Sequence, residues 1–135
     1  MKKMAVDEIR QTFTKFFVEK NHELIKGSYL VPQDDPTLLY INSGMAPLKK
    51  YFLNKATPNN PRMVNIQLCI RTKDIDEVGD RHHLTMFEMM GSWSIGDYYK
   101  ETACKLAFEL LVDRLEFDIN RLWVTVYKGD KKLGL

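Results

Sequence analysis

The chain has 135 residues, of which 44% are hydrophobic and 28% are charged, as in a soluble globular protein of one domain. Its 20 basic and 18 acidic residues give a net charge of +2, which neither indicates nor excludes a nucleic-acid partner. No apolar run approaches the roughly 18 residues of a membrane span, and no apolar stretch follows the basic N-terminus, so we expect neither a membrane partner nor a signal peptide.

The two cysteines, Cys69 and Cys104, lie far apart in an otherwise ordinary sequence. We interpret them as reduced thiols in the core, because disulfides are rare in the cytosol and no disulfide framework is visible. This usage predicts a cytoplasmic protein.

The first predicted element is an amphipathic helix over residues 6–20. Its apolar residues recur at helical spacing with charged residues between them, which indicates a face packed on the core. These residues are Val6, Ile9, Phe13, Phe16 and Phe17.

Short elements follow between residues 29 and 61. The pattern predicts strands at residues 29–31 and 38–41, and a helical turn at residues 47–52. The PQDDP segment after the first of these strands is expected to be a turn, because proline fixes φ and bars a helix. The TPNNP segment at residues 57–61 is expected to be a loop.

Two longer strands are predicted at residues 63–71 and 84–93. The first alternates, so its apolar residues face one side while Asn65, Gln67, Cys69 and Arg71 face the other. We expect the apolar side to pack on the core and the polar side to line a cleft. The connecting loop has two basic and four acidic residues, a net charge of −2. Its length is unusual for a hairpin, and such loops are often functional.

A helix is predicted after Asp97, which is a plausible N-cap. Residues 122–127 (LWVTVY) alternate as a final strand. Because the strands cluster with short connections, the chain is expected to be an α+β domain with a mostly antiparallel sheet. The apolar face of the helix consists of Ala103, Leu106, Ala107, Leu110, Leu111 and Leu115.

Arg71 and Phe87 form the strongest candidate site. A guanidinium at a strand end can hold a phosphate through its fixed fork of donors. An aromatic ring on the neighbouring strand can stack on adenine, which stabilises binding by about 1–3 kcal/mol per base. The alternative is that the arginine is a solvated surface charge and the phenylalanine a core residue. The sequence has neither GxxxxGK[ST] nor GxGxxG, so a nucleotide would bind without a phosphate-cradling glycine loop.

A zinc site is not expected. His82 and His83 are adjacent and would point to opposite faces of a strand, whereas zinc ligands must converge. The sequence also has no CxxC pair and no GxSxG turn.

Several motifs in one order then resemble class II aminoacyl-tRNA synthetases, in the form found in alanine–tRNA ligases. The segments EIRQTFTKFFVEKNHE and GSYLVPQDDPTLLYINSGMAPLKKYF are similar to the family's first helix and the stretch after it. CIR, DIDEVG, HH, TMFEM and GSWSIGDYYK follow in the order of motif 2, and LAFELL and RLWVTVY complete the series. The resemblance covers essentially all of residues 1–135.

The resemblance implies a partial class II catalytic core, an antiparallel sheet flanked by helices. It implies that alanine's carboxylate attacks the α-phosphate of ATP, giving alanyl-adenylate and pyrophosphate, and that the alanyl group then passes to the terminal adenosine of tRNA. ATP, Mg²⁺, alanine and tRNA are the implied ligands and partners, in the cytoplasm. DNA, a membrane and structural zinc are not expected.

The resemblance also implies residue roles. Arg71 matches the motif 2 arginine, which would bind the charge on the α-phosphate and orient the carboxylate, and Phe87 matches the ring on which adenine stacks. Asp76, Glu77 and His83 would make local hydrogen bonds in the loop beside ATP. Two further residues, Met45 and Trp93, would line the amino-acid pocket or pack in the core.

Motif 3, a glycine-rich element with a second arginine, is not found in the sequence. We therefore expect residues 1–135 to be the N-terminal portion of a catalytic domain, with the motif 1 and motif 2 regions and weak or no activity alone. Two alternatives stay open. One is a truncated paralogue that activates another small carboxylate, and the other is a non-enzymatic binding or assembly module.

Overall fold

The computed structural model describes residues 3–33, 35–73 and 75–126. The predicted α+β class is confirmed, because helices flank a three-stranded sheet. The elements in chain order are α1 (Val6–Glu19), β1 (Glu23–Leu24), η1 (Ala46–Leu48), α2 (Lys49–Phe52), β2 (Arg62–Ile70), η2 (Ile75–Glu77), β3 (Met86–Ser94), α3 (Lys100–Phe108), the π-helix η3 (Glu109–Arg114) and η4 (Ile119–Arg121).

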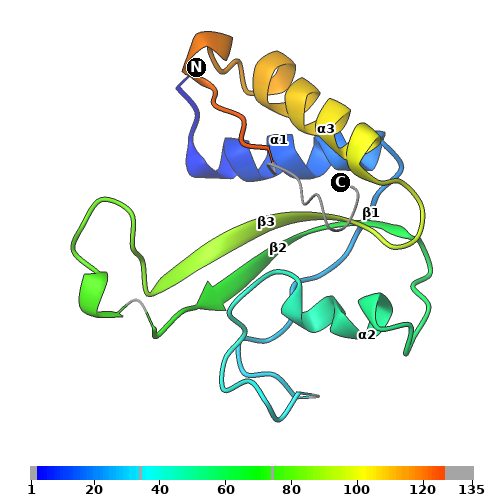
Figure 1. The fold of residues 1–135 in the computed structure, drawn as a ribbon, viewed down its shortest axis with the longest axis vertical. Helices are drawn as coiled ribbons and strands as arrows, with labels where there is room; N and C mark the ends of the chain where they lie inside the picture. Colours follow the sequence, from blue (N-terminus) through cyan, green and yellow to red (C-terminus); the bar gives the residue numbers. More distant parts are fainter. Residues whose placement is uncertain (1–2, 34, 74, 127–135) are drawn as a thin grey trace, which may run out of the picture.

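The fold has three layers (Figure 1). Helices α1 and α3 lie side by side on one face of the β2–β3 hairpin, and α2 with its flanking loops lies on the other face. The loop that connects β2 to β3 projects beyond the sheet. The hairpin is therefore the central layer, and its two faces meet different kinds of structure.

The sheet has the order β1-β2-β3 and is mixed rather than purely antiparallel. β2 and β3 pair antiparallel over their whole length, from Arg62 opposite Ser94 to Ile70 opposite Met86. The two-residue strand β1 pairs parallel to β2. β1 begins four residues after the end of α1, and its chain runs in the same direction as β2.

The aromatic stripe of α1 forms the main core, as predicted. Phe13, Phe16 and Phe17 are buried against Val64 of β2 and against Leu106 and Leu110 from the second helical segment. Phe16 and Phe17 meet edge to face with ring centroids 5.0 Å apart. Removing these side chains from water is the main force that holds the helices on the sheet.

Three predicted short strands do not form among the described residues. Residues 29–31 and 38–41 are loops, joined by one hydrogen bond from the Ile41 amide to the Leu30 carbonyl (2.8 Å). Pro32 removes a donor at this point, so a regular ladder does not develop. Residues 122–126 have strand-like alternation but no strand assignment, and Tyr127 lies outside the described residues. The helical turn near residues 47–52 and the loop at 57–61 are confirmed.

The prediction for the two faces of β2 is only partly confirmed: Val64 on the apolar side is buried in the core, as expected, but the polar side is buried as well. Asn65 (2% exposed), Gln67 (0%) and Cys69 (0%) are buried, whereas Leu68 on the other face is 41% exposed. The polar side, here called the loop-covered face, is covered by the segment of residues 27–52. The apolar side, here called the helix-covered face, packs on α1 at Val64, and Arg10 of α1 pairs with Glu88 on the same face.

Two smaller predictions are also wrong. The N-cap of α3 is Tyr99, not Asp97, because the Asp97 carboxylate pairs with the Arg62 guanidinium instead. Cys104 is exposed on α3, so only Cys69 is a core thiol. Within the described residues, no helix has the length and apolar character needed to span a membrane.

Candidate active site

The loop-covered face supports the candidate site through one buried amide. Gln67 Oε1 accepts from the Ser28 amide (2.8 Å), and Gln67 Nε2 donates to the Ser28 carbonyl (3.0 Å). These bonds tie the start of the covering segment to the centre of β2. A buried side chain whose donors and acceptors are all used fixes one arrangement of the chain.

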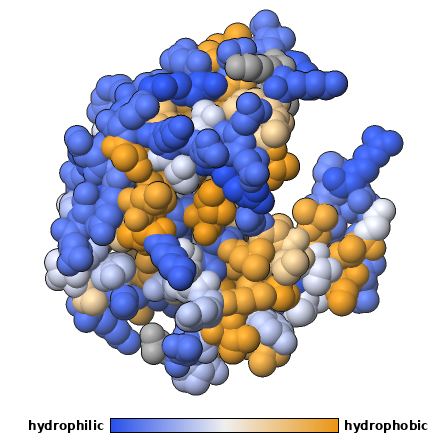
Figure 2. Space-filling view, turned by 180° about the vertical axis from the view of Figure 1, so that it is seen from behind, coloured by the Kyte–Doolittle hydropathy of each residue, from blue (hydrophilic) through white to orange (hydrophobic). Residues whose placement is uncertain are grey.

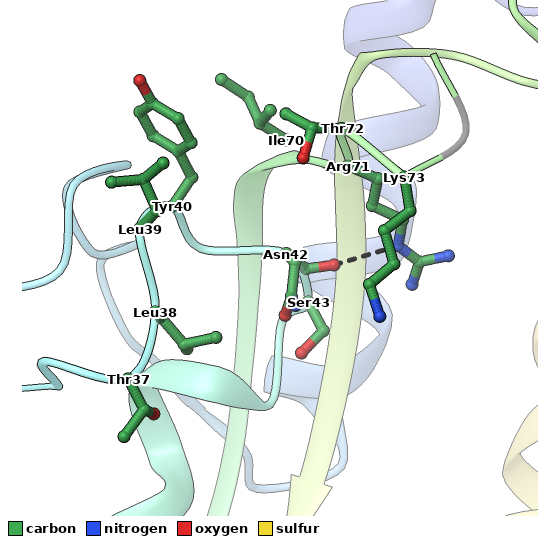
Figure 3. Close-up of a pocket in the computed structure, with 10 residues that line it drawn as sticks. All are labelled: Thr37, Leu38, Leu39, Tyr40, Asn42, Ser43, Ile70, Arg71, Thr72 and Lys73. Atoms are coloured by element: carbon green, nitrogen blue, oxygen red, sulfur yellow. Dashed lines mark hydrogen bonds between the residues drawn. The ribbon is translucent and has the colours of Figure 1, made fainter. Parts of the chain in front are cut away.

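Arg71 directly follows β2, and its position is set by the hairpin register. Its amide donates to the Thr85 carbonyl (2.9 Å), which continues the pairing one step beyond the strands. Its Nε donates to the Asn42 carbonyl (3.1 Å), shown as the dashed line in Figure 3. The guanidinium is thus held against the covering segment while the side chain remains exposed.

Phe87 lies beneath Arg71 on the same face. Because Phe87 pairs with Cys69, two residues before Arg71, both side chains project to the loop-covered face. The Cζ atom of Arg71 lies 5.3 Å from the centroid of the Phe87 ring, a cation–π contact. The ring packs on a cluster of Ile41, Ala46 and Cys69. The structure therefore brings the two predicted residues together.

A cavity of about 440 Å³, here called the Arg71 cavity, opens beside this pair. Figure 3 shows that two chain segments form its wall: the loop of residues 37–43 and residues 70–73 at the end of β2. Arg71 lines the cavity, whereas Phe87, Met45 and Trp93 are not among its lining residues. The lining residues are Thr37, Leu38, Leu39, Tyr40, Asn42, Ser43, Ile70, Arg71, Thr72 and Lys73.

The loop after Arg71 is organised around His83 and Asp80. His83 Nδ1 contacts Asp80 Oδ2 at 2.6 Å, and His83 Nε2 contacts Glu77 Oε2 at 2.9 Å. Asp80 Oδ1 also accepts from the amides of His82 (2.7 Å) and His83 (2.6 Å). The two amide bonds, first that of His83, and the His83 side chain lower the pKa of Asp80 to about 2.

Asp80 is the loop residue that the sequence interpretation missed. An aspartate that accepts from the amides following it is a common turn device, so its place before two histidines was an available signal. Asp76 lies on η2 and is exposed. Asp74 lies outside the described residues. The structure thus places Glu77 and His83 in one local network.

Trp93 and Met45 do not line the Arg71 cavity, although the Trp93 indole lies against Gly44, next to the lining residue Ser43. Trp93 pairs with Met63, six positions along β3 from Phe87, or roughly 20 Å at the rise of a strand. Its Nε1 donates to Asn65 Oδ1 (2.9 Å), so the indole is held within the loop-covered face. Met45 is 45% exposed. A role for either residue in an amino-acid pocket stays a prediction.

Potential metal ligands are scattered in the part of the chain that the structure describes. No group of three or more His, Cys, Asp or Glu side chains converges in residues 3–33, 35–73 and 75–126. Mg²⁺ in nucleotide sites is usually held by one or two carboxylates together with the phosphates of the substrate. The binding of Mg²⁺ with ATP and the absence of structural zinc therefore both stay predictions.

Comparison of the chain with known proteins finds similar sequences. A family model described as tRNA synthetases class II (A) matches residues 8–134. The chain is 54% identical over 136 residues to an alanine–tRNA ligase of Leuconostoc mesenteroides, covering 98% of this chain and 15% of that protein. It is 52% identical over 134 residues to an alanine–tRNA ligase of Mycoplasma mycoides, covering 96% of this chain and 15% of that protein.

A third relative carries the same name. An alanine–tRNA ligase of Dehalococcoides mccartyi is 51% identical over 124 residues, which cover 92% of this chain and 14% of that protein. The chain thus spans about 15% of the length of the curated relatives it matches.

Proposed function

Because this chain belongs to the class II tRNA synthetases, we propose that it takes part in the ATP-dependent activation of alanine and the transfer of the alanyl group to tRNA. Three relatives named alanine–tRNA ligase, at 51–54% identity, support the choice of alanine. The observation that carries the proposal is the contact between Arg71 and Phe87 beside the Arg71 cavity.

Arg71 is proposed to bind the α-phosphate of ATP. Negative charge builds on the phosphate oxygens as the carboxylate of alanine attacks in line. A guanidinium fixed at the end of a strand can stabilise that charge without first reorganising, and it can hold the carboxylate for attack. The bond from Arg71 Nε to the Asn42 carbonyl leaves the two terminal nitrogens for the substrate.

Phe87 is proposed to stack on the adenine. In the described conformation the Arg71 guanidinium lies over this ring, at 5.3 Å from its centroid. A cation–π contact at an exposed site stabilises by only about 0.5–1 kcal/mol, less than the roughly 1–3 kcal/mol of a base on an aromatic ring. Adenine can therefore displace the guanidinium from the ring, and the phosphate offers it a stronger partner.

ATP binding is tested by thermal unfolding of the chain with and without ATP. A ligand at 100 times its Kd stabilises the folded state by about 2.7 kcal/mol. We expect Arg71→Ala and Phe87→Ala to remove this protection, and Arg121→Ala to retain it, because Arg121 lies on η4 away from the site. Protection that survives both site variants contradicts the assignment. No protection of the unaltered chain favours the binding-module alternative.

The choice of alanine is tested in a chimera. This chain replaces the matched segment of the Leuconostoc mesenteroides enzyme, and amino-acid-dependent exchange of pyrophosphate into ATP is measured. We expect exchange with alanine, and a loss of 100-fold or more with Arg71→Ala, as for removal of one donor to a developing charge. Exchange with a different small amino acid would favour the paralogue alternative.

A further inference from the structure

A second cavity, here called the lysine pocket, lies between the loop of residues 26–37 and the segment of residues 41–55. Its volume is about 770 Å³, within the usual range of ligand sites. Four of its described lining residues are lysines and one is an aspartate. The lysines are Lys26, Lys49, Lys50 and Lys55.

The single acid among the described lining residues, Asp35, already accepts hydrogen bonds from within the chain. Asp35 Oδ2 accepts from Lys49 Nζ (2.8 Å), and Asp35 Oδ1 accepts from the amide of Thr37 (3.0 Å). The bond from Lys49, then that from the Thr37 hydroxyl, then that from the Thr37 amide lower the pKa of Asp35 to about 2. The sequence places Asp34 beside it, so even with both acids counted the four lysines leave a net charge of +2.

The rim of the lysine pocket is fixed, and its floor is apolar. Gln67 holds Ser28, which lines the rim, through two hydrogen bonds of 2.8 and 3.0 Å. Ile41 and Ala46 are buried in the floor. Tyr29 lines the same pocket with 74% of its surface exposed. A fixed rim, several ammonium groups and an exposed aromatic ring are the parts of a site for a single-stranded nucleic acid.

The position of the lysine pocket suggests which nucleic acid it serves. Thr37 lines both the lysine pocket and the Arg71 cavity, so the two are neighbours. The loop of residues 72–83 on the other side of the Arg71 cavity has a net charge of −2 and repels a phosphate backbone. An RNA strand that reaches the Arg71 cavity meets favourable charge from the lysine side.

We propose that the lysine pocket binds the phosphate backbone of the single-stranded RNA whose end enters the Arg71 cavity, with Lys26, Lys50 and Lys55 on the phosphates and Tyr29 stacked on a base. That the RNA is tRNA rests on the proposed function. The pocket's affinity for single-stranded RNA does not.

The test is fluorescence anisotropy of a labelled single-stranded oligoribonucleotide of about eight nucleotides, titrated at several salt concentrations. Each phosphate contact to a single strand adds about 0.7 to the slope of log affinity against log salt. The triple variant Lys26→Gln/Lys50→Gln/Lys55→Gln should therefore reduce the slope by about 2. Tyr29→Ala should weaken binding with the slope unchanged.

The matched control carries the same charge change elsewhere. Lys15→Gln/Lys100→Gln/Lys105→Gln removes three exposed lysines from α1 and α3 and should leave the slope nearly unchanged. Equal losses in the two triple variants would show binding by net charge alone and would overturn the proposal, as would no RNA binding at low salt.

ATP protection separates this proposal from the proposed function. The Lys26→Gln/Lys50→Gln/Lys55→Gln variant should keep full protection by ATP, and Arg71→Ala should keep the salt slope for RNA. If ATP protection is absent while the slope depends on the three lysines, the proposed function fails and the RNA site stands. If ATP protection is present and the salt slope does not depend on the three lysines, the proposed function stands and the RNA site fails.

Discussion

The loop-covered face of the β2–β3 hairpin carries polar side chains that are almost fully buried, whereas the helix-covered face carries apolar side chains of which several are exposed. Gln67 is 0% exposed, and Met86, on the opposite face, is 58% exposed. Figure 2 shows apolar side chains gathered at the surface beside the base of the projecting hairpin loop.

The difference follows from what each face must do. The loop-covered face positions Arg71, Phe87 and the rim of the lysine pocket, so it needs directional contacts that fix irregular chain in place. Hydrogen bonds supply direction, and the hydrophobic effect does not. The helix-covered face only anchors α1 and α3, and burial of aromatic rings around Val64 is sufficient for that.

The largest expected effect comes from breaking the loop-covered face at Gln67. Gln67→Leu keeps the approximate volume and leaves the amide and carbonyl of Ser28 without their partner. Gln67 Nε2 also donates to the Leu68 carbonyl (2.8 Å), and each lost hydrogen bond costs about 0.5–1.5 kcal/mol, so we expect a loss of about 3 kcal/mol in the free energy of unfolding, measured in urea. A loss below about 1 kcal/mol would mean that this face is not held by the amide.

Gly91→Ala is expected to have the next largest effect. A Cβ at this position would overlap the Trp93 indole, which lies directly over Gly91. Overpacking of this kind costs about 1–3 kcal/mol. Ser92→Ala, one residue along and on the helix-covered face, is the matched control and should be nearly neutral.

A double variant tests whether the loss in Gly91→Ala comes from overlap with Trp93. In the double variant Gly91→Ala/Trp93→Leu the smaller side chain leaves room for the methyl group, so the two losses should not add. Strict additivity would contradict the close contact between these residues.

How far the sequence predicted this arrangement depended on the range of the contacts. Alternation and helical spacing are local, and they predicted α1, β2 and β3 nearly to the residue. The hairpin register then placed Arg71 and Phe87 on one face. The burial of Gln67 depends on Ser28, 39 residues earlier, and no local pattern contains that information. The same is true of Asp97, whose partner Arg62 is 35 residues away.

A buried polar residue beside α1, His22, predicts a pH dependence of stability. His22 is 3% exposed; its Nε2 lies 2.7 Å from Tyr98 Oη, and its ring meets Phe17 edge to face. Burial lowers the pKa of His22 below its ordinary value. The unfolded state therefore binds the proton more readily, so the stabilisation is full above about pH 6.5 and is lost as pH falls through that value towards the folded-state pKa.

Urea unfolding between pH 7.5 and 5.5 measures this slope. We expect stability to fall on acidification in the unaltered chain and the fall to become shallower in His22→Gln. A slope that is the same in both proteins would assign the pH dependence to other groups.

The smallest expected effect comes from Leu68→Gln, the reverse of the substitution at Gln67. Leu68 neighbours Gln67 on β2 but faces the other way and is 41% exposed. Leu68→Gln places the same amide on the helix-covered face, where water can satisfy it, and should change the free energy of unfolding by less than about 0.5 kcal/mol. The pair Gln67→Leu and Leu68→Gln thus exchanges the two side-chain types at adjacent positions, and the chemistry of the residues alone would predict the opposite ranking.

A loss above about 1 kcal/mol in Leu68→Gln would mean that this surface is covered in solution. Repeating the urea unfolding at two protein concentrations then decides the matter, because a surface buried between two copies of the chain makes the unfolding midpoint depend on concentration. A large loss without such dependence would contradict the exposure of this part of the helix-covered face.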